Sequence, residues 1–260
     1  MMSMTPKLQQ LHTFIFTSAP PLYSKEFPVM FFWSPKSGCT SLIKWFYFQL
    51  GILNEALDYD PWVHTYRMEV FQKQNDYMRN AILTLHDTKD KEVYKLVRNP
   101  YTRAVSSFLF AFSFDEAMNS VAPEAVNGSI SFKEFLYKVK NNEHGRIDTH
   151  ISKQYVQNEE AYVTKYIRLE NFASEMAAIE KSYGLLASPI EEITKSHHHN
   201  ADKISAGINQ SFADVKLSKQ SLRNMSLPDY RHFYDEETKN LVQELFADDF
   251  KTYGYSLENF

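Results

Sequence analysis

The segment 31–42, Phe-Phe-Trp-Ser-Pro-Lys-Ser-Gly-Cys-Thr-Ser-Leu, joins an apolar run to a helix-period stretch through one tight turn. Such a junction favours an anion, because Gly38 lets backbone N–H groups approach it and the following helix presents unpaired amides and a positive dipole end. Lys36 adds a mobile cation, and Thr40 and Ser41 add hydroxyl donors. The pattern predicts a phosphate-binding loop. The alternative interpretation is an ordinary strand–turn–helix junction.

The order of lysine and glycine separates this loop from the common nucleoside-triphosphate loop, in which lysine follows the second of two glycines. Here Lys36 precedes Gly38, the only glycine of the turn. This order resembles the 5′-phosphosulfate loop of the sulfotransferases, enzymes that use 3′-phosphoadenosine 5′-phosphosulfate (PAPS). The resemblance implies that the loop binds the 5′ end of the donor. The implied cofactor-binding residues are Lys36, Ser37, Gly38, Cys39, Thr40 and Ser41.

A second strand-like run ends in Arg98 and leads through Asn99-Pro100 into another helix-period stretch. Asn99 suits a helix N-cap, and Pro100 suits the first helical position. Arginine at the carboxyl end of a parallel strand can hold a phosphate through a bidentate fork, aided by a helix serine such as Ser106. The stretch resembles the 3′-phosphate motif of the sulfotransferases, which implies that Arg98 and Ser106 hold the 3′-phosphate of PAPS.

Further stretches, at 148–154, 166–172 and 234–255, are similar to landmarks of the Golgi-type carbohydrate sulfotransferases. The resemblance spans 28–255 and implies that the acceptor is a hydroxyl of a carbohydrate or glycoconjugate. The chain shows no signal-peptide pattern, no long apolar span and only one cysteine, Cys39. These features predict a protein without a transmembrane segment in a reducing compartment, and so a bacterial or cytoplasmic relative of that subfamily.

Alternating strand-like and helix-like runs predict an α/β fold with three layers, α/β/α, around a central parallel sheet of the P-loop nucleotide-binding type. The length of 260 residues suits one sulfotransferase domain over 1–260, with an N-terminal extension at 1–27 and a lid or loop region at 185–233. The net charge of −4 argues against a nucleic-acid partner. The expected strands are 29–33, 93–97 and 163–169, and the clearest expected helices are 40–50, 101–112, 131–140, 171–183 and 236–250.

Sulfuryl transfer needs positioning, neutralisation of the leaving group and removal of a proton from the acceptor. Lys36 is expected to neutralise the bridging oxygen. The candidate general bases are His64 and His86, because a histidine titrates near neutrality, and Glu69 is a third candidate. Each histidine can equally be a surface or structural residue. Cys39 can be a reactive thiol at a helix N-terminus, but we interpret it as a packing residue.

No metal is expected, because sulfuryl transfer requires none and the adjacent histidines at 197–199 point in different directions. Two further sets of residues are candidates for ligand contacts, and solvated surface is their alternative. Lys195, His199 and Asn200 are candidates for contacts with PAPS. The candidates for contacts with an anionic or sugar acceptor are Arg67, His150, Lys153 and Gln154.

Two other functions stay open at the level of sequence. The first is a P-loop kinase that uses ATP, against which the order of Lys36 and Gly38 argues. The second is a nucleotide-binding interaction protein that has lost catalysis, although the chain retains Lys36 and both candidate histidines.

Overall fold

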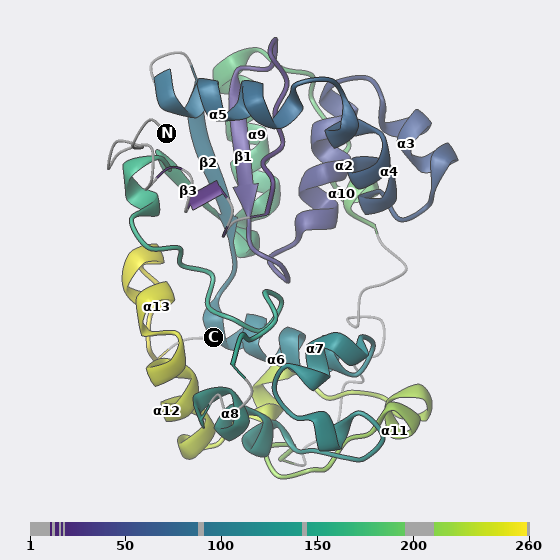
Figure 1. Ribbon diagram of the computed structural model, residues 1–260, viewed down its shortest axis with the longest axis vertical. Helices are drawn as coiled ribbons and strands as arrows, with labels where there is room; N and C mark the ends of the chain where they lie inside the picture. Colours follow the sequence, from purple (N-terminus) through teal and green to yellow (C-terminus); the bar gives the residue numbers. More distant parts are fainter. Residues whose placement is uncertain are drawn as a thin grey trace, which may run out of the picture. The chain divides into compact units, whose positions relative to one another are not determined.

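The computed structural model describes residues 11, 14, 15, 17, 19–87, 91–141, 145–195 and 211–258, and Figure 1 shows its elements. The chain divides into two compact units. The sheet unit comprises Met1–Arg98 and Val156–Lys195, and the helical unit comprises Asn99–Tyr155 and Ser196–Phe260. The expectation of one sulfotransferase domain stays a prediction.

The elements of the sheet unit alternate between strands and helices along the chain. Its strands are β1 (Val29–Trp33), β2 (Glu92–Val97) and β3 (Lys165–Arg168). Its helices are α2 (Cys39–Gln49), α3 (Leu53–Tyr59), α4 (His64–Glu69), α5 (Tyr77–Asp87), α9 (Phe172–Tyr183) and α10 (Ile190–Thr194), with short 3-10 turns η1 (Phe71–Lys73), η3 (Glu159–Ala161) and η4 (Leu169–Asn171).

The three strands form one parallel sheet in the order β1-β2-β3. The prediction of an α/β protein with a parallel sheet is therefore confirmed, and the first strand has the predicted bounds. The third strand is shorter than the predicted 163–169, because η4 begins at Leu169. Because parallel strands share an orientation, the chain leaves β1 and β2 at the same edge of the sheet.

One face of the sheet is covered by α2 and α9. Phe31 of β1 packs edge-on against Trp45 of α2, with ring centroids 5.5 Å apart. The Trp45 indole N–H donates to Glu180 of α9 at 2.7 Å. These contacts bury the apolar positions of α2 that recur at helical spacing, and so fix the helix that follows the predicted phosphate loop.

The opposite face carries a buried ion pair. The Lys95 ammonium of β2 contacts the Glu159 carboxylate of η3, and both residues are almost fully buried. Glu159 also accepts the Val156 backbone N–H at 2.9 Å. On the same face, Phe14 packs against Phe32 with ring centroids 4.7 Å apart. A charge of each sign is thus enclosed beside the central strand.

The described elements of the helical unit are helices and 3-10 turns. They are α6 (Pro100–Ala111), α7 (Asp115–Asn119), η2 (Pro123–Ala125), α8 (Phe132–Asn141), α11 (Lys219–Asn224), η6 (Tyr230–Phe233), α12 (Glu236–Leu245) and α13 (Ala247–Tyr253).

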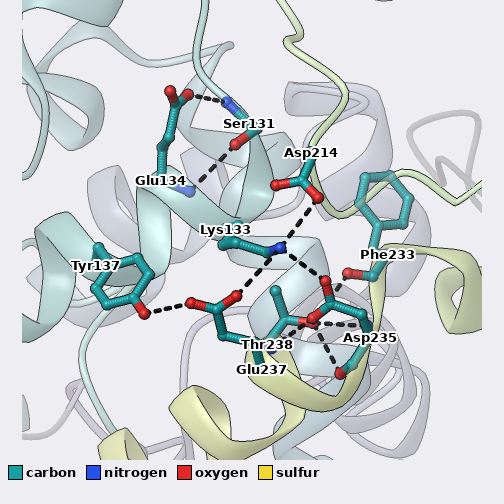
Figure 2. A network of polar contacts seen from close by, with 9 residues as sticks. All are labelled: Ser131, Lys133, Glu134, Tyr137, Asp214, Phe233, Asp235, Glu237 and Thr238. Carbon is teal, nitrogen blue, oxygen red and sulfur yellow. Dashed lines mark hydrogen bonds and ion pairs between the residues drawn. The ribbon is translucent and has the colours of Figure 1, made fainter.

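A polar network joins α8 to α12 (Figure 2). Ser131 and Glu134 form a capping box at the start of α8: Glu134 accepts the Ser131 N–H at 2.9 Å, and the Ser131 hydroxyl accepts the Glu134 N–H at 3.2 Å. Lys133 extends between carboxylates of Asp214 and Asp235, at 3.0 and 2.8 Å. Three acidic neighbours therefore saturate this lysine, because Glu237 is also within 3.3 Å.

The expectation of one helix over 236–250 is wrong. Phe246 leaves the helical region, with φ −116° and ψ 28°, and separates α12 from α13. Asp248 and Asp249 fall in the first turn of α13, where carboxylates are favoured by the helix dipole. Asp249 is also fully buried and accepts the backbone N–H groups of Gln154 and Tyr155. The second helix start thus supplies a buried acceptor for a distant segment.

Candidate functional site

The turn between β1 and α2 depends on two residues with positive φ, Lys36 at 68° and Gly38 at 91°. A Cβ added at Gly38 would lie 2.4 Å from Leu169 Cδ1. The Ser37 hydroxyl lies 2.6 Å from the Ser34 carbonyl oxygen and 3.1 Å from that of Leu96, both of which are acceptors. The buried Ser37 side chain therefore fixes the loop over the end of β2 and faces inward.

The N-terminus of α2 has no side-chain cap. The Leu42 N–H donates to the Gly38 carbonyl at 3.2 Å, so the N–H groups of residues 38–41 precede the first bond of the helix. Glycine at the N-cap supplies no oxygen to accept them. This end of α2 presents several amide donors and the positive end of the helix dipole.

His64, the first residue of α4, lies against the first turn of α2. Its Nε2 is 3.2 Å from Thr40 Oγ1 and 3.6 Å from Cys39 Sγ. Only 8% of the residue is exposed, and its ring lies near that of Trp62. The structure thus brings one of the two candidate bases to the predicted phosphate loop.

The other candidate bases lie elsewhere in the sheet unit. His86 is exposed in the last turn of α5, and Figure 1 shows α5 at the edge of the sheet where β1 and β2 begin. The loop follows the opposite, carboxyl ends of the strands. Glu69 is exposed at the end of α4 and accepts the Tyr59 hydroxyl at 2.8 Å.

Arg98 follows the last residue of β2, as predicted. Its Nη1 donates to the Lys36 carbonyl at 3.2 Å, so the arginine also supports the backbone of the loop. Ser106 is buried on α6 and belongs to the helical unit, whereas Arg98 belongs to the sheet unit. The joint binding of a 3′-phosphate by these two residues stays a prediction.

Burial raises the pKa of the Cys39 thiol above its ordinary value, although the charges of Lys36 and Arg67 and nearby backbone hydrogen bonds act against this rise. Burial outweighs the helix terminus in this case, because the thiolate would lose its hydration. The interpretation of Cys39 as a packing residue agrees with this direction.

Of the acceptor candidates in the helical unit, His150 has a ring that is held by a hydrogen bond and a stacking contact. Its Nδ1 donates to Asp148 at 2.8 Å, and its ring stacks on Phe110 with centroids 4.3 Å apart. The hydrogen bond from His150 lowers the pKa of Asp148. The Ser107 hydroxyl donates to the His150 carbonyl, which fixes the segment on α6. In the neutral form of a histidine held in this way, Nε2 is the acceptor nitrogen.

Of the remaining candidates, Lys153 and Gln154 contact acidic side chains, Lys195 is exposed, and others lie outside the described residues. Lys153 pairs with Asp248 at 2.6 Å, and Gln154 is buried beside Asp249. The Lys195 carbonyl accepts the Lys44 ammonium at 2.9 Å. The predicted PAPS contacts His199 and Asn200 lie outside the described residues, as do the histidines at 197 and 198.

In the described part of the chain, no group of three or more His, Cys, Asp or Glu residues is arranged to hold a metal ion. The same part contains no helix with the length and apolar character needed to cross a membrane.

An open parallel sheet whose first strand leads into an uncapped helix is typical of α/β proteins that bind phosphate-bearing ligands. A match to a family model identifies the family within this class. The chain belongs to the sulfotransferase family, whose model matches residues 22–256 and so extends over both units. Membership makes the protein a transferase of sulfuryl groups. Comparison with curated proteins and with solved structures gave no match.

Proposed function

We propose that the protein transfers the sulfuryl group of PAPS to a hydroxyl of a carbohydrate or glycoconjugate. The observation that carries the proposal is the contact of His64 with Thr40 at the uncapped start of α2, directly after Lys36. One short region thereby combines anion donors, a mobile cation and a group able to take a proton.

The donor is proposed to bind in two parts. The amides of residues 38–41, the hydroxyls of Thr40 and Ser41 and the ammonium of Lys36 would hold the 5′-phosphosulfate, in the manner of a P-loop. Arg98 and Ser106 would hold the 3′-phosphate through charge-assisted hydrogen bonds. Because the Ser37 hydroxyl already faces backbone carbonyls, its role is to shape the loop.

In the proposed reaction the acceptor oxygen attacks sulfur, and the bond between sulfur and the bridging phosphate oxygen breaks. The electron pair of that bond leaves with 3′,5′-adenosine bisphosphate (PAP). Lys36 neutralises the charge that develops on the bridging oxygen, and His64 takes the proton of the acceptor hydroxyl. His64 is preferred to His86 and Glu69 because it alone of the three has described contacts with the first turn of α2.

On the acceptor side, we propose that His150 receives a hydrogen bond from a sugar hydroxyl. Asp148 holds its Nδ1 as the donor, so Nε2 is the accepting nitrogen. The His150 ring stacks on Phe110, which in turn stacks on Phe114 with centroids 4.6 Å apart, and Phe114 is exposed at the surface. Such a surface suits the apolar face of a sugar ring.

Two measurements test the proposal. In a thermal shift experiment without magnesium, PAP should stabilise the protein and ATP should not, since a kinase would show the reverse preference. Radiolabelled sulfate should then pass from PAPS to a member of a carbohydrate panel.

The role of His64 needs matched variants. His64→Ala should abolish transfer with nearly unchanged PAP affinity, whereas the exposed His86→Ala should retain most activity. The wild-type rate should rise with pH, because the base must be neutral. The reverse behaviour of the two variants would assign the base to His86, and full activity in both would make Glu69 the next residue to test.

A further inference from the structure

Arg67 of α4 is an arginine enclosed in the interior of the sheet unit. Only 9% of the residue is exposed. Its Nη1 donates to Gln72 Oε1 at 2.8 Å, and its guanidinium carbon lies 5.4 Å from the ring centroid of Trp33. Its Nε is buried without a hydrogen-bond partner in the described part of the chain. In the described part of the chain, one amide oxygen and one ring face are therefore the contacts of a side chain that carries five N–H donors.

This enclosure is costly, because a guanidinium stays charged and a buried charge needs an anion near it. Among residues 19–87, 91–141, 145–195 and 211–258, no carboxylate forms an ion pair with Arg67. Burial accordingly lowers the pKa of the guanidinium. Tyr47 of α2 adds a second buried polar atom, its hydroxyl, with no described partner. The interior on this side of α2 thus has polar groups in excess of their partners.

The position of Arg67 relates this excess to the predicted donor site. Trp33, beneath its guanidinium, is the last residue of β1 before the loop. Cys39, the first residue of α2, feels the charges of both Lys36 and Arg67. One turn earlier on α4, His64 contacts the same cysteine. An anion at the start of α2 would therefore have Lys36 in its loop and a second, buried cation on the side of α4.

We propose that Arg67 is the interior counter-charge for the 5′-phosphosulfate of the donor. This inference rests on the proposed donor site and adds a residue to it. The ligand class is a phosphate or sulfate ester, whose negative charge compensates the buried guanidinium. The empty protein then carries an uncompensated charge that donor binding relieves, so the same side chain lowers stability and raises affinity.

The test uses the full-length protein and the variant Arg67→Met, which keeps an apolar stem of similar size and removes the charge. The melting temperature of the unliganded variant should rise by about 2–4 °C. Its affinity for PAP should fall about tenfold, as expected for a unit charge lost within a few ångströms of a phosphate. Its affinity for adenosine 5′-monophosphate should fall by the same factor, because the two nucleotides share the 5′-phosphate. Arg67→Lys, which keeps the charge, should retain most of the affinity.

Lys91 supplies a matched control in the same unit. Its ammonium lies 5.3 Å from the ring centroid of Tyr23 and donates to the backbone carbonyls of Ser24 and Lys25 at 2.8 and 2.6 Å. Because this cation has partners, Lys91→Met should lower the melting temperature and leave PAP affinity unchanged.

The outcomes separate this inference from the proposed function. A lower melting temperature for Arg67→Met, or failure of the variant to fold, would show that Arg67 only stabilises the structure. Unchanged PAP affinity in Arg67→Met, with weakened affinity in Lys36→Ala and Arg98→Ala, would overturn the role of Arg67 alone. Absence of PAP binding by the wild type would overturn the donor site and this inference together.

Discussion

Two strands of the sheet lead into helices, and the two junctions treat the helix end in opposite ways. At the start of α6, Asn99 Oδ1 accepts the Tyr101 N–H at 2.9 Å, and Pro100 removes a further donor. At the start of α2, Gly38 offers no side-chain oxygen and adopts a left-handed conformation. The start of α6 thus has a side-chain acceptor for one of its donors, whereas the start of α2 has no side-chain acceptor.

The contrast teaches how a donor with two phosphate groups can be divided between the junctions. The junction of β1 and α2 has main-chain amides to offer, whereas the junction of β2 and α6 must rely on side chains such as Arg98 and Ser106. Main-chain donors recognise an anion of almost any shape, but a guanidinium fork prefers a phosphate of defined orientation. We therefore expect the junction of β2 and α6 to discriminate between PAPS and other adenine nucleotides.

The largest expected effect concerns Lys36, at the junction of β1 and α2. Lys36→Ala should lower kcat by about 10²–10³-fold, as for the loss of one group that stabilises transition-state charge, and lower PAP affinity only moderately. Alanine keeps the Cβ at φ 68°, so the backbone strain of the loop is retained. Steady-state kinetics with PAPS measure the effect, and Lys73→Ala on the exposed end of η1 is the control. An equal loss in binding and turnover would contradict a role confined to the transition state.

The next largest effect concerns Arg98, at the junction of β2 and α6. Arg98→Ala should weaken PAP binding by about 1.5–3 kcal/mol, the cost of one charge-assisted contact. Binding of adenosine 5′-monophosphate should be weakened less, through loss of the bond from Arg98 to the Lys36 carbonyl. Isothermal titration of both nucleotides checks the difference. Equal weakening of the two would remove Arg98 from 3′-phosphate recognition.

A pair of cap variants compares the junctions directly. Gly38→Ala should cost about 1–2 kcal/mol of folding free energy, because an alanine at φ 91° is strained, and Leu169 must also move. Asn99→Ala should cost about 1 kcal/mol through loss of the cap of α6. Urea denaturation gives both values. Only Gly38→Ala should also lower the affinity for adenosine 5′-monophosphate. The same loss of affinity in Asn99→Ala would contradict the proposed functional difference between the two junctions.

The smallest effect is chemical. Because burial raises the pKa of Cys39, a smaller fraction of its thiol is ionised at a given pH than in a free cysteine. Alkylation by iodoacetamide at pH 8 should be slower than for a free cysteine, and its rate should increase with pH. Mass spectrometry follows the reaction without interference, since the chain has one cysteine. Faster alkylation than that of free cysteine would indicate an activated thiol.

Local sequence signals predicted the features that local physics controls. The apolar run at Val29–Trp33 and the cap formed by Asn99 and Pro100 both appear as expected. Each depends on residues within one turn or one strand. The position of Arg98 after β2 followed for the same reason, and these elements already locate both predicted phosphate motifs.

Features that depend on distant contacts were not predictable. The short helix α3 has Ile52 at its N-cap and no side-chain cap, so no local signal marks its start. The choice between His64 and His86 needed the packing of α4 on α2. The enclosure of Arg67 depends on Trp33 and Gln72 lying around it, and a solvated surface arginine has the same local sequence. Periodicity carries no information on such contacts.

The ion pair of Lys95 and Glu159 has a consequence for the alignment of the strands. In the observed register, Lys95 stands opposite Phe32 and Tyr166, on the face where Glu159 lies. A slip by one residue would turn Lys95 to the other face, among the aromatic rings of α2, and would leave both charges buried alone. Strands of four to six residues have few hydrogen bonds with which to exclude such a slip. We therefore expect the buried ion pair to favour one strand register over the others. That register determines the positions of the loop after β1 and of the arginine after β2.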